Sequence, residues 1–308
     1  MIVEQEGITI NEIFDKCGEE YFRKTECEVI KKAAEMKNVV IATGGGSMVK
    51  AAYSSGKPAL GVGPGNVQTI LDRDIDLEVE IPKVIAGRIF DNGIICSGEQ
   101  TAITPASMYD DMVKTFQKNG AYYVEKPEEI DAVRNVIFPG GKMNKDAVGQ
   151  SAQHIAKMAG LTVPADTVVL LVKVEKAGAG EPFSKEKMCP CIAAYRYNTW
   201  EEAVAIANAN LNVEGKGHSV CIHSYNDAHI DYAAETLPVS RFLINQICST
   251  NNGGSFFNSL SATTTLGCGS WGNNSISENL SWRHLFNVSR VAKVRPGSTM
   301  PTDEEIWG

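Results

Sequence analysis

The stretch RIFDNGIICSGEQTAI, residues 88–103, contains the side chain best suited to covalent chemistry in this sequence. Residues 91–93 (DNG) are typical of a turn, two isoleucines follow that we expect to point inward, and Cys96 comes next. Ser97 and Gly98 are small enough to let a substrate approach the sulfur. A nucleophilic cysteine needs a partly exposed, polar setting that favours the thiolate. Local sequence alone favours the plainer alternative, a cysteine buried in the core.

The other cysteines do not form a recognisable site. Eight cysteines are spread over 308 residues, which is too dilute for a disulfide scaffold and typical of a reducing compartment. Cys189 and Cys191 flank a proline, and Cys221 and His223 are two residues apart. Closed zinc sites need four ligands at a recognisable spacing, and no CxxC pair is present. We therefore expect no metal site and interpret these thiols as small core residues.

Composition and charge exclude several classes of partner. The net charge is −8, the pI is near 5.3, and no run of Lys or Arg occurs, which argues against a nucleic-acid or anionic membrane surface. No stretch approaches the roughly 20 apolar residues of a membrane-spanning helix, and the start lacks the pattern of a signal peptide. We expect a cytoplasmic protein whose partner is a small molecule.

Helices and strands alternate along the chain, which predicts the α/β class. Helical spacing of apolar residues and capping residues predict helices in the segments 9–36, 108–119, 130–137, 148–159 and from 199 onward. Apolar runs predict strands in the segments 38–42, 58–62 and 168–174, and in the stretches HSVCIHS and RFLINQ. The segment 249–274 is the longest irregular region, and loops of that length are more often functional than idle.

From about residue 40 to the end, the chain resembles the coenzyme-A-acylating aldehyde dehydrogenases. Among these are the succinate-semialdehyde enzymes and the aldehyde half of bifunctional aldehyde–alcohol dehydrogenases. The resemblance rests on MVKAAYSSGKPALGVGPGN, FDNGIICSGEQ, KEKMCP, EGKGHSVCIHS, TTTLGCGSWGNNSISENLSWRHLFNVSRVA and the terminal EEIWG. It implies a Rossmann-like cofactor domain, a catalytic domain and an oligomerising segment, with Cys96 at the place of the family nucleophile.

The same resemblance implies a reaction and further site residues. Cys96 would form a thioester by passing hydride from a thiohemiacetal to NAD or NADP, and coenzyme A would take the acyl group. Hydrolytic relatives carry a water-activating glutamate where Gly61 stands here, so transfer to a thiol is favoured over hydrolysis. His218 matches a histidine that assists acyl transfer, although a loop histidine with a packing role is an equal alternative.

Cofactor contacts are also implied by the family. Glu186, in EKMCP, matches the glutamate that holds the nicotinamide ribose hydroxyls; the alternative is an exposed charge after Lys185. The remaining cofactor-binding residues are expected in two glycine-rich stretches, at Gly44, Gly45, Gly63, Gly65 and Asn66. The expected partners are an aldehyde and coenzyme A, and a second copy of the chain in a homo-oligomer.

Residues before about 46 resemble a different family. They are similar to the central segment of shikimate kinases, where a G-E-x-x-F-R helix and three glycines meet shikimate; here these are residues 18–23 and 44–46. Arg23 would bind a carboxylate if that pocket existed. The stretch SSGKPA does not fit the phosphate-binding pattern G-x-x-x-x-G-K-[ST], so phosphoryl transfer is not expected. Both families contain a strand that ends in ATGG, where the chain changes from one to the other.

The two resemblances together predict a chimera with an aldehyde dehydrogenase-like fold, a complete catalytic domain and a truncated Rossmann-like cofactor domain. The expected divisions are a kinase-like segment 1–43, a dinucleotide-binding remnant 44–88, a catalytic domain 89–253, and a return to the cofactor domain with an oligomerisation tail at 254–308. Loss of the first half would remove an oxyanion donor, which typically costs about 10²–10³ in rate. Two alternatives remain, a shikimate-binding module and an inactive fragment.

Overall fold

The computed structural model describes residues 59–308 and scattered residues before them: 2–8, 12–13, 16–18, 21–22, 24–25, 28–29, 32, 49, 52–54 and 56. The first helix is α1 (Ile2–Glu6). Phe22 and Val29 are helical and buried, as the apolar face predicted for this segment requires. The predicted strand 38–42, most of the capping box at 9–12, and both Gly44 and Gly45 lie outside the described residues.

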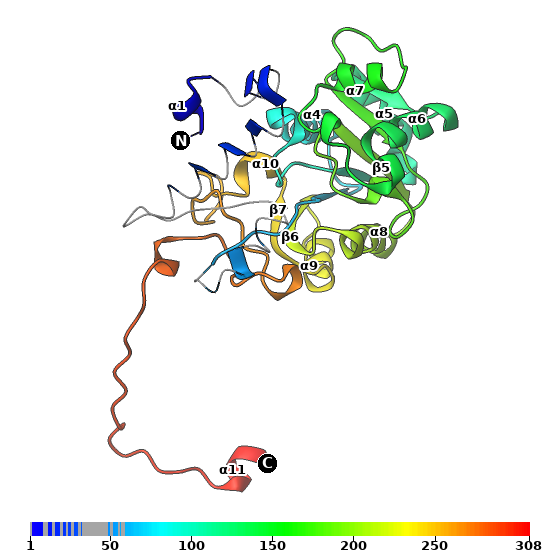
Figure 1. Ribbon diagram of the computed structural model, residues 1–308. Helices are drawn as coiled ribbons and strands as arrows, with labels where there is room; N and C mark the ends of the chain where they lie inside the picture. The colour runs from blue at the N-terminus through cyan, green and yellow to red at the C-terminus, as the bar shows by residue number, and fades with distance from the viewer. Residues whose placement is uncertain are drawn as a thin grey trace.

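The centre of the molecule is a seven-stranded sheet in the order β3-β4-β5-β2-β1-β6-β7 (Figure 1). Every neighbouring pair in it is parallel. The strands are β1 (Gln68–Leu71), β2 (Thr101–Pro105), β3 (Ala121–Val124), β4 (Val169–Lys173), β5 (Cys191–Tyr197), β6 (Gly217–His223) and β7 (Val239–Ile244). Parallel strands need crossover connections, and helices supply most of them here.

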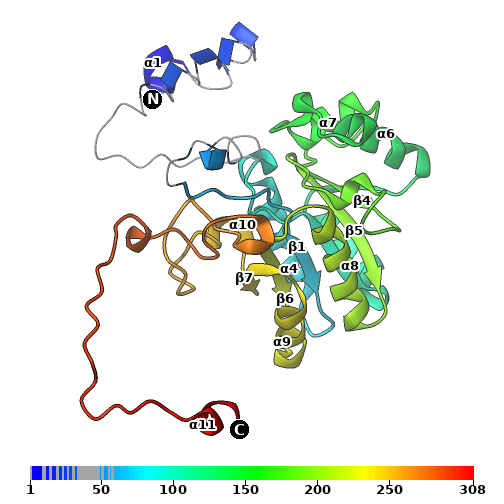
Figure 2. The same cartoon turned by 60° about the horizontal axis from the view of Figure 1, so that its bottom comes forward.

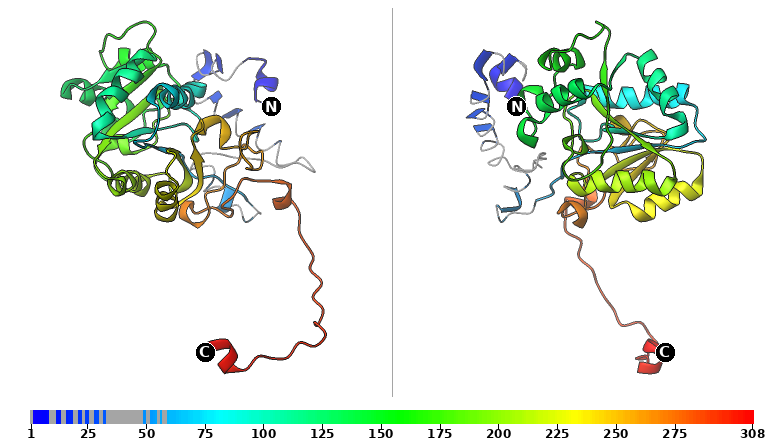
Figure 3. Two further views of the ribbon diagram at one scale, coloured as in Figure 1. Left: turned by 180° about the vertical axis from the view of Figure 1, so that it is seen from behind. Right: turned by 90° about the vertical axis from the view of Figure 1, so that its right-hand side faces the viewer.

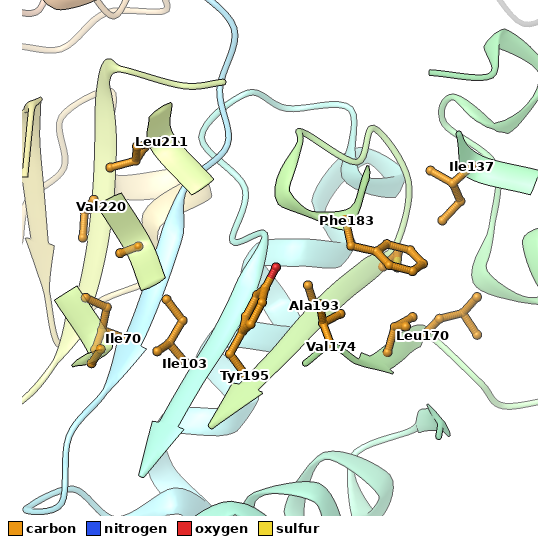
Figure 4. Packing of buried hydrophobic residues seen from close by; sticks show 14 of the residues in the cluster. Ile70, Ile103, Ile137, Leu170, Val174, Phe183, Ala193, Tyr195, Leu211 and Val220 are labelled. Carbon is orange, nitrogen blue, oxygen red and sulfur yellow. The ribbon is translucent and has the colours of Figure 1, made fainter. Parts of the chain in front are cut away.

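Helices cover both faces of the sheet, which explains why its strands are apolar on both sides. In β4, Leu170 and Val172 pack in one core with residues of α6, α7 and α8, while Val169 and Leu171 pack in the other with α4 and α5. Figure 4 shows the first core, where side chains from neighbouring strands line one face of the sheet. The molecule is therefore a three-layer α/β domain, as the sequence predicted.

The helices beyond residue 59 are α4 (Leu77–Ile89), α5 (Tyr109–Lys118), α6 (Pro127–Ile137), α7 (Ala152–Met158), α8 (Trp200–Val213), α9 (Asp227–Thr236), α10 (Cys248–Asn251) and α11 (Asp303–Trp307). The helices predicted at 108–119, 130–137, 148–159 and from 199 onward correspond to α5, α6, α7 and α8, whereas α4, α9, α10 and α11 were not predicted. Thr199 caps α8 by accepting a hydrogen bond from the backbone N–H of Glu202. After α5, Gly120 has a φ of +86°, a left-handed conformation that suits glycine at a helix end.

Two local predictions were wrong. Residues 59–62 are irregular rather than a strand. Ile94 is 40% exposed, so it does not point inward as expected. The expected domain boundary after residue 88 lies at the end of α4, before β2; β1 belongs to the same sheet as the strands of segment 89–253, and α4 packs on that sheet. The sheet needs β1 because this strand joins β2 to β6.

The C-terminal segment leaves the body of the molecule. Residues 285–308 are exposed throughout and end in the short helix α11. Figures 2 and 3 show this segment running away from the sheet in every view. Its large apolar side chains are accordingly uncovered, and Val291, Val294 and Met300 are each at least 85% exposed. Within the described parts of the chain, no helix is both long and apolar enough to cross a membrane.

Candidate active site

The predicted site residues lie where four neighbouring strands begin. Asn66 comes just before β1, Cys96 before β2 and Glu186 before β5, and His218 is the second residue of β6. These strands are adjacent in the order β5-β2-β1-β6. Because the amino ends of parallel strands meet at the same edge of a sheet, residues that are far apart in the sequence gather there. The sheet order thus explains how one site draws on residues 63–218.

Cys96, Gly65 and Glu186 meet at the centre of this edge. A Cβ atom added to Gly65 would overlap the carbonyl oxygen of Cys96 and lie 2.7 Å from Glu186 Oε1. On its other side, the carbonyl oxygen of Gly65 lies against Gly215. Glycine is needed here for close approach of one backbone to another. The structure therefore brings three of the predicted site residues into direct contact.

The surroundings of Cys96 suppress its ionisation in this state. Cys96 is half-buried and packs against a small cluster formed by Val62, Leu266 and Cys268. Burial, followed by the charge of Glu186, raises the pKa of the Cys96 thiol to about 12, while the charge of Arg241 opposes this rise. The thiolate consequently forms more easily when Glu186 is protonated.

Glu186 titrates near neutral pH. Burial, followed by the charge of Glu214, raises the pKa of the Glu186 carboxyl to about 7, and Arg88 opposes the rise. The backbone N–H of Glu186 donates to Glu214 Oε2 at 2.9 Å, which holds the two carboxyl groups near each other. Two acids close together cannot both ionise cheaply. The predicted alternative, a solvated surface charge, is not what the geometry shows.

The loop at 63–66 is fixed by polar contacts from distant segments. The backbone N–H of Gly63 donates to Asn274 Oδ1 at 3.1 Å. Asn66 Nδ2 donates to the carbonyl oxygens of Ser184 and Glu214, at 2.8 and 2.9 Å. Asn66 Oδ1 is buried and has no hydrogen-bond partner among the described residues. Gly63 and Asn66 thus belong to the site edge.

His218 is buried at the same edge but is not joined to Cys96. Its backbone N–H donates to Gly215, and both ring nitrogens lack a partner among the residues that the structure describes. Burial, and then the charge of Arg241, lowers the pKa of His218 to about 3, so the ring is neutral. No hydrogen bond recorded for the described chain links this ring to Cys96. A neutral imidazole with two free nitrogens could still accept a proton from a ligand.

Three buried cations hold the loops of the site, and sequence reasoning missed all of them. Arg88 donates to the carbonyl oxygens of Gly93 and Glu99, on either side of Cys96. The ammonium of Lys187 donates to the carbonyl oxygens of Phe183 and Lys185 at 2.8 and 3.0 Å, and the guanidinium of Arg241 donates to those of Gly267 and His218 at 2.8 and 2.9 Å. Arg88 lies inside the motif at 88–103, but nothing in its local sequence indicates burial.

A second group of polar side chains lies between β6 and α4. Cys221 Sγ is 3.4 Å from His223 Nε2, and His223 Nδ1 is 2.5 Å from Glu80 Oε2. All three side chains are buried, and Lys83 also pairs with Glu80. Among the described residues, no group of three or more His, Cys, Asp or Glu side chains is placed to hold a metal ion.

The fold and the loop that carries Cys96 can be compared with those of solved structures. A parallel α/β sheet with a cysteine loop at the start of a central strand matches solved aldehyde dehydrogenases. An acetylating aldehyde dehydrogenase from Geobacillus thermoglucosidasius superimposes with a TM-score of 0.80 at 36% identity, over 87% of this chain and 59% of that one. A propionaldehyde dehydrogenase from Rhodopseudomonas palustris, solved with bound CoA and an acylated cysteine, gives 0.66 at 26% identity over 76% and 52% of the two chains.

The chain is homologous to the acylating aldehyde dehydrogenases over most of its length. It is 51% identical over 281 residues to the acetylating succinate-semialdehyde dehydrogenase of Clostridium kluyveri, covering 91% of this chain and 62% of the relative. It is 41% identical over 260 residues to the bifunctional aldehyde–alcohol dehydrogenase of Escherichia coli, covering 83% of this chain and 29% of the relative. The chain thus spans about three fifths or less of these relatives. Residues 1–55 also match the shikimate kinase family, which confirms the double resemblance.

Proposed function

We propose that this chain carries the acyl-transfer half of a CoA-acylating aldehyde dehydrogenase, which converts an aldehyde and coenzyme A to an acyl-CoA or runs in reverse. The observation that carries the proposal is the meeting of Cys96, Gly65 and Glu186 at the amino edge of the sheet. The names of the relatives support it, since the Rhodopseudomonas structure holds CoA and an acylated cysteine. A bound nicotinamide cofactor would supply the hydride acceptor.

In the proposed reaction, Cys96 is the nucleophile. Its thiolate adds to the aldehyde carbonyl, and loss of hydride from the resulting thiohemiacetal leaves a Cys96 thioester. The thiol of coenzyme A then attacks the thioester and releases the Cys96 thiolate. Protonated Glu186 favours the thiolate, and Glu186 is also the proposed contact to the cofactor ribose, together with the loop of Gly63, Gly65 and Asn66. Gly44 and Gly45 remain proposed cofactor residues without a described position.

Acyl transfer is proposed to go to a thiol rather than to water. No carboxylate is present at Gly61, whose backbone N–H donates to the hydroxyl of Tyr53. The proposed acceptor of the coenzyme A proton is His218, whose ring nitrogens have no partner among the described residues. Burial and the charge of Arg241 lower the pKa of His218 to about 3, so this role requires that binding of coenzyme A raise the pKa. Product analysis after incubation with aldehyde, NAD⁺ and coenzyme A tests this proposal. Free acid as the main product would show that water has a base that we have not identified.

The aldehyde is proposed to be one of those in the relatives' names. The relatives include a succinate-semialdehyde dehydrogenase and a sulfoacetaldehyde dehydrogenase of Bilophila wadsworthia, the latter 37% identical over 286 residues. Both named aldehydes are anionic. A panel of succinate semialdehyde, sulfoacetaldehyde and acetaldehyde, with NAD⁺ and NADP⁺ in parallel, would assign the substrate and the cofactor. We also propose that the chain as given turns over more slowly than a full-length relative, and comparison of the two kcat values tests this.

A second candidate function rests on the segment that matches the shikimate kinase family. Binding of shikimate, measured by calorimetry, would support a shikimate-binding module at residues 1–43. The third candidate, an inactive fragment, would show labelling of Cys96 by alkylating reagents without any turnover. These outcomes separate the three candidates, because each predicts a different positive result.

We propose a catalytic unit that begins near residue 67, where the sheet starts, and a return to the cofactor domain from about residue 254. The exposed segment 285–308 is proposed as an oligomerisation tail, since its apolar side chains are uncovered in the single chain. Light scattering on the full chain and on a chain ending at residue 284 tests this. The same number of subunits in both proteins would contradict it. Seven of the eight cysteines are described and all are free thiols, in keeping with the proposed cytoplasmic location.

A further inference from the structure

The loop that carries Cys96 is bridged by one buried side chain. Arg88 lies in the last turn of α4 and is 0% exposed. Its Nη1 donates to the carbonyl oxygen of Glu99 at 3.2 Å, and its Nη2 donates to that of Gly93. Cys96 stands midway between these two residues. A single guanidinium therefore ties together both ends of the nucleophile loop, residues 93–99.

The backbone just before this loop needs support from outside. Asp91, Asn92 and Gly93 all have left-handed φ angles, of 49°, 47° and 74°. Consecutive residues in this region persist only where surrounding groups determine their conformation. A Cβ atom on Gly93 would overlap Arg88 Nη2 and lie 2.7 Å from the carbonyl carbon of Cys189. The guanidinium therefore packs directly against the strained turn.

We infer that Arg88 is a positioning residue for the acyl transfer proposed above, holding the nucleophile loop through two main-chain carbonyls so that Cys96 stays against Gly65 and Glu186. The inference rests on the proposed function for its catalytic meaning, but the positioning can be measured without turnover. Arg88 acts through the backbone and is not itself a catalytic residue. The guanidinium of arginine is suited to this task because it is planar and always charged, and its N–H donors can bind two acceptors at once.

Amide hydrogen exchange of residues 94–99 in the full chain tests the bridge. Arg88→Met should raise the exchange rates there by about tenfold or more, because local opening becomes easier. Arg88→Lys should give a smaller rise than Arg88→Met, since an ammonium can still bind one of the two carbonyl oxygens although it cannot bridge both. The matched control is Arg196→Met, which removes an exposed arginine that stacks on Tyr109 away from this loop and should leave residues 94–99 unchanged.

The alkylation rate of Cys96 supplies a second readout. Loss of structure in another part of the chain would not change this rate. Burial raises the pKa of Cys96, so release of the loop should expose the thiol and speed its labelling several-fold relative to the exposed Cys17. Where wild type turns over, kcat should fall by about 100-fold in Arg88→Met with KM little changed, and lysine should restore part of it.

The outcomes are distinct for the inference and for the proposed function. Unchanged exchange and labelling in a folded Arg88→Met protein would overturn the positioning role, whatever happens to turnover. Absence of thioester in wild type would count against the proposed function alone. If Arg88→Met does not fold, Arg88→Lys decides, and wild-type protection at both ends of the loop in that variant would overturn the inference.

Discussion

At the scale of single residues, the site depends on buried ionisable groups whose protonation is set by position. Glu186 and Glu99 both have carboxyl pKa values raised from 4.5 to about 7, mainly by burial. Cys96 has its thiol pKa raised, in part by Glu186. Ionisation of the Cys96 thiol is therefore coupled to the charge of Glu186. A ligand that neutralises Glu186 would at the same time favour the thiolate.

Cys96 should be alkylated faster than Cys189, Cys221 or Cys268 at mildly alkaline pH. It is half-buried, whereas the other three side chains are 0% exposed. Its raised pKa should also make it slower than the exposed Cys17. Peptide mapping after timed exposure to iodoacetamide measures this order. Labelling of Cys96 among the slowest sites would remove its assignment as the nucleophile.

Glu99→Gln should reduce the pH dependence of stability. With its carboxyl pKa raised to about 7, folded Glu99 binds a proton more tightly than the unfolded chain does between pH 4.5 and 7. The free energy of unfolding should therefore fall as the pH rises through this window, by about 3 kcal/mol at most. The variant keeps the acceptor for the backbone N–H of Cys248 but cannot ionise.

Thermal unfolding of wild type and Glu99→Gln at pH 5 and pH 8 measures this effect. The difference in Tm between the two pH values should be smaller in the variant, and the variant should be the more stable protein at pH 8. The exposed Glu235→Gln is the matched control and should behave like wild type. A variant that is less stable than wild type at pH 8 would contradict the raised pKa.

At the scale of elements, the amino-end loops are built for close approach. The loop at 63–66 lies between the nucleophile loop and the segment at Gly215, with room for a side chain at one of its glycines and not at the other. A Cβ on Gly63 would sit 3.6 Å from Cys268 Sγ, an ordinary contact. A Cβ on Gly65 would overlap backbone atoms of Cys96.

Gly65→Ala should therefore disrupt the site while Gly63→Ala should not. Overpacking against backbone cannot be relieved by a rotamer change, so Gly65→Ala should destabilise the fold by about 1–3 kcal/mol and alter the labelling rate of Cys96. Gly63→Ala should stay within about 0.5 kcal/mol of wild type. Chemical denaturation and timed alkylation of both variants measure this. Equal behaviour of the two variants would mean that the loop is not packed as described.

The elements differ in how well their sequence predicted them. Long periodic segments such as α5 and α6 and the apolar run of β4 were predicted correctly, because burial on one or both faces leaves a clear pattern. The prediction of a strand at 58–62 was wrong because a short apolar run also occurs in irregular segments. Four-residue β1 was missed, being too short to show a period.

The site was only partly predictable for a different reason. Cys96, Glu186 and Gly65 came from motif resemblance, and the structure brings them together. The contacts of Arg88, Lys187 and Arg241 go to main-chain carbonyls, which every residue carries, so no side-chain pattern in the sequence reveals them. Partners of this kind become visible only when the tertiary fold is known.

At the scale of the whole molecule, the sheet and its two helical layers form a self-sufficient unit from about residue 67. We therefore expect limited proteolysis to cut before residue 67 or within the exposed segment 285–302. It should spare β1, which lies inside the sheet, and α4, which packs on it. Mass spectrometry of the first fragments measures this. Early cuts between residues 67 and 88 would show that these elements belong to the weaker part.

Cofactor binding by this chain should be weak. The described residues that we propose as nucleotide contacts lie at one edge of the sheet, so NAD⁺ should bind this chain less tightly than it binds a full-length relative. Calorimetric titration of both proteins measures the difference. Tight binding, together with protection of residues 1–66 from protease, would contradict this expectation and show that residues 1–66 contribute to the cofactor site.

The hydrogen bonds of the three buried cations to main-chain carbonyl oxygens affect which loop substitutions the protein can tolerate. Arg88, Lys187 and Arg241 donate to peptide oxygens, which every residue type carries. At loop positions whose side chains are not packed against a neighbour, a substitution should therefore leave these hydrogen bonds in place. Gly65 and Gly93 are exceptions, because a Cβ atom there would overlap other atoms. The loops at the amino edge of the sheet thus combine positions that tolerate substitution with two that do not.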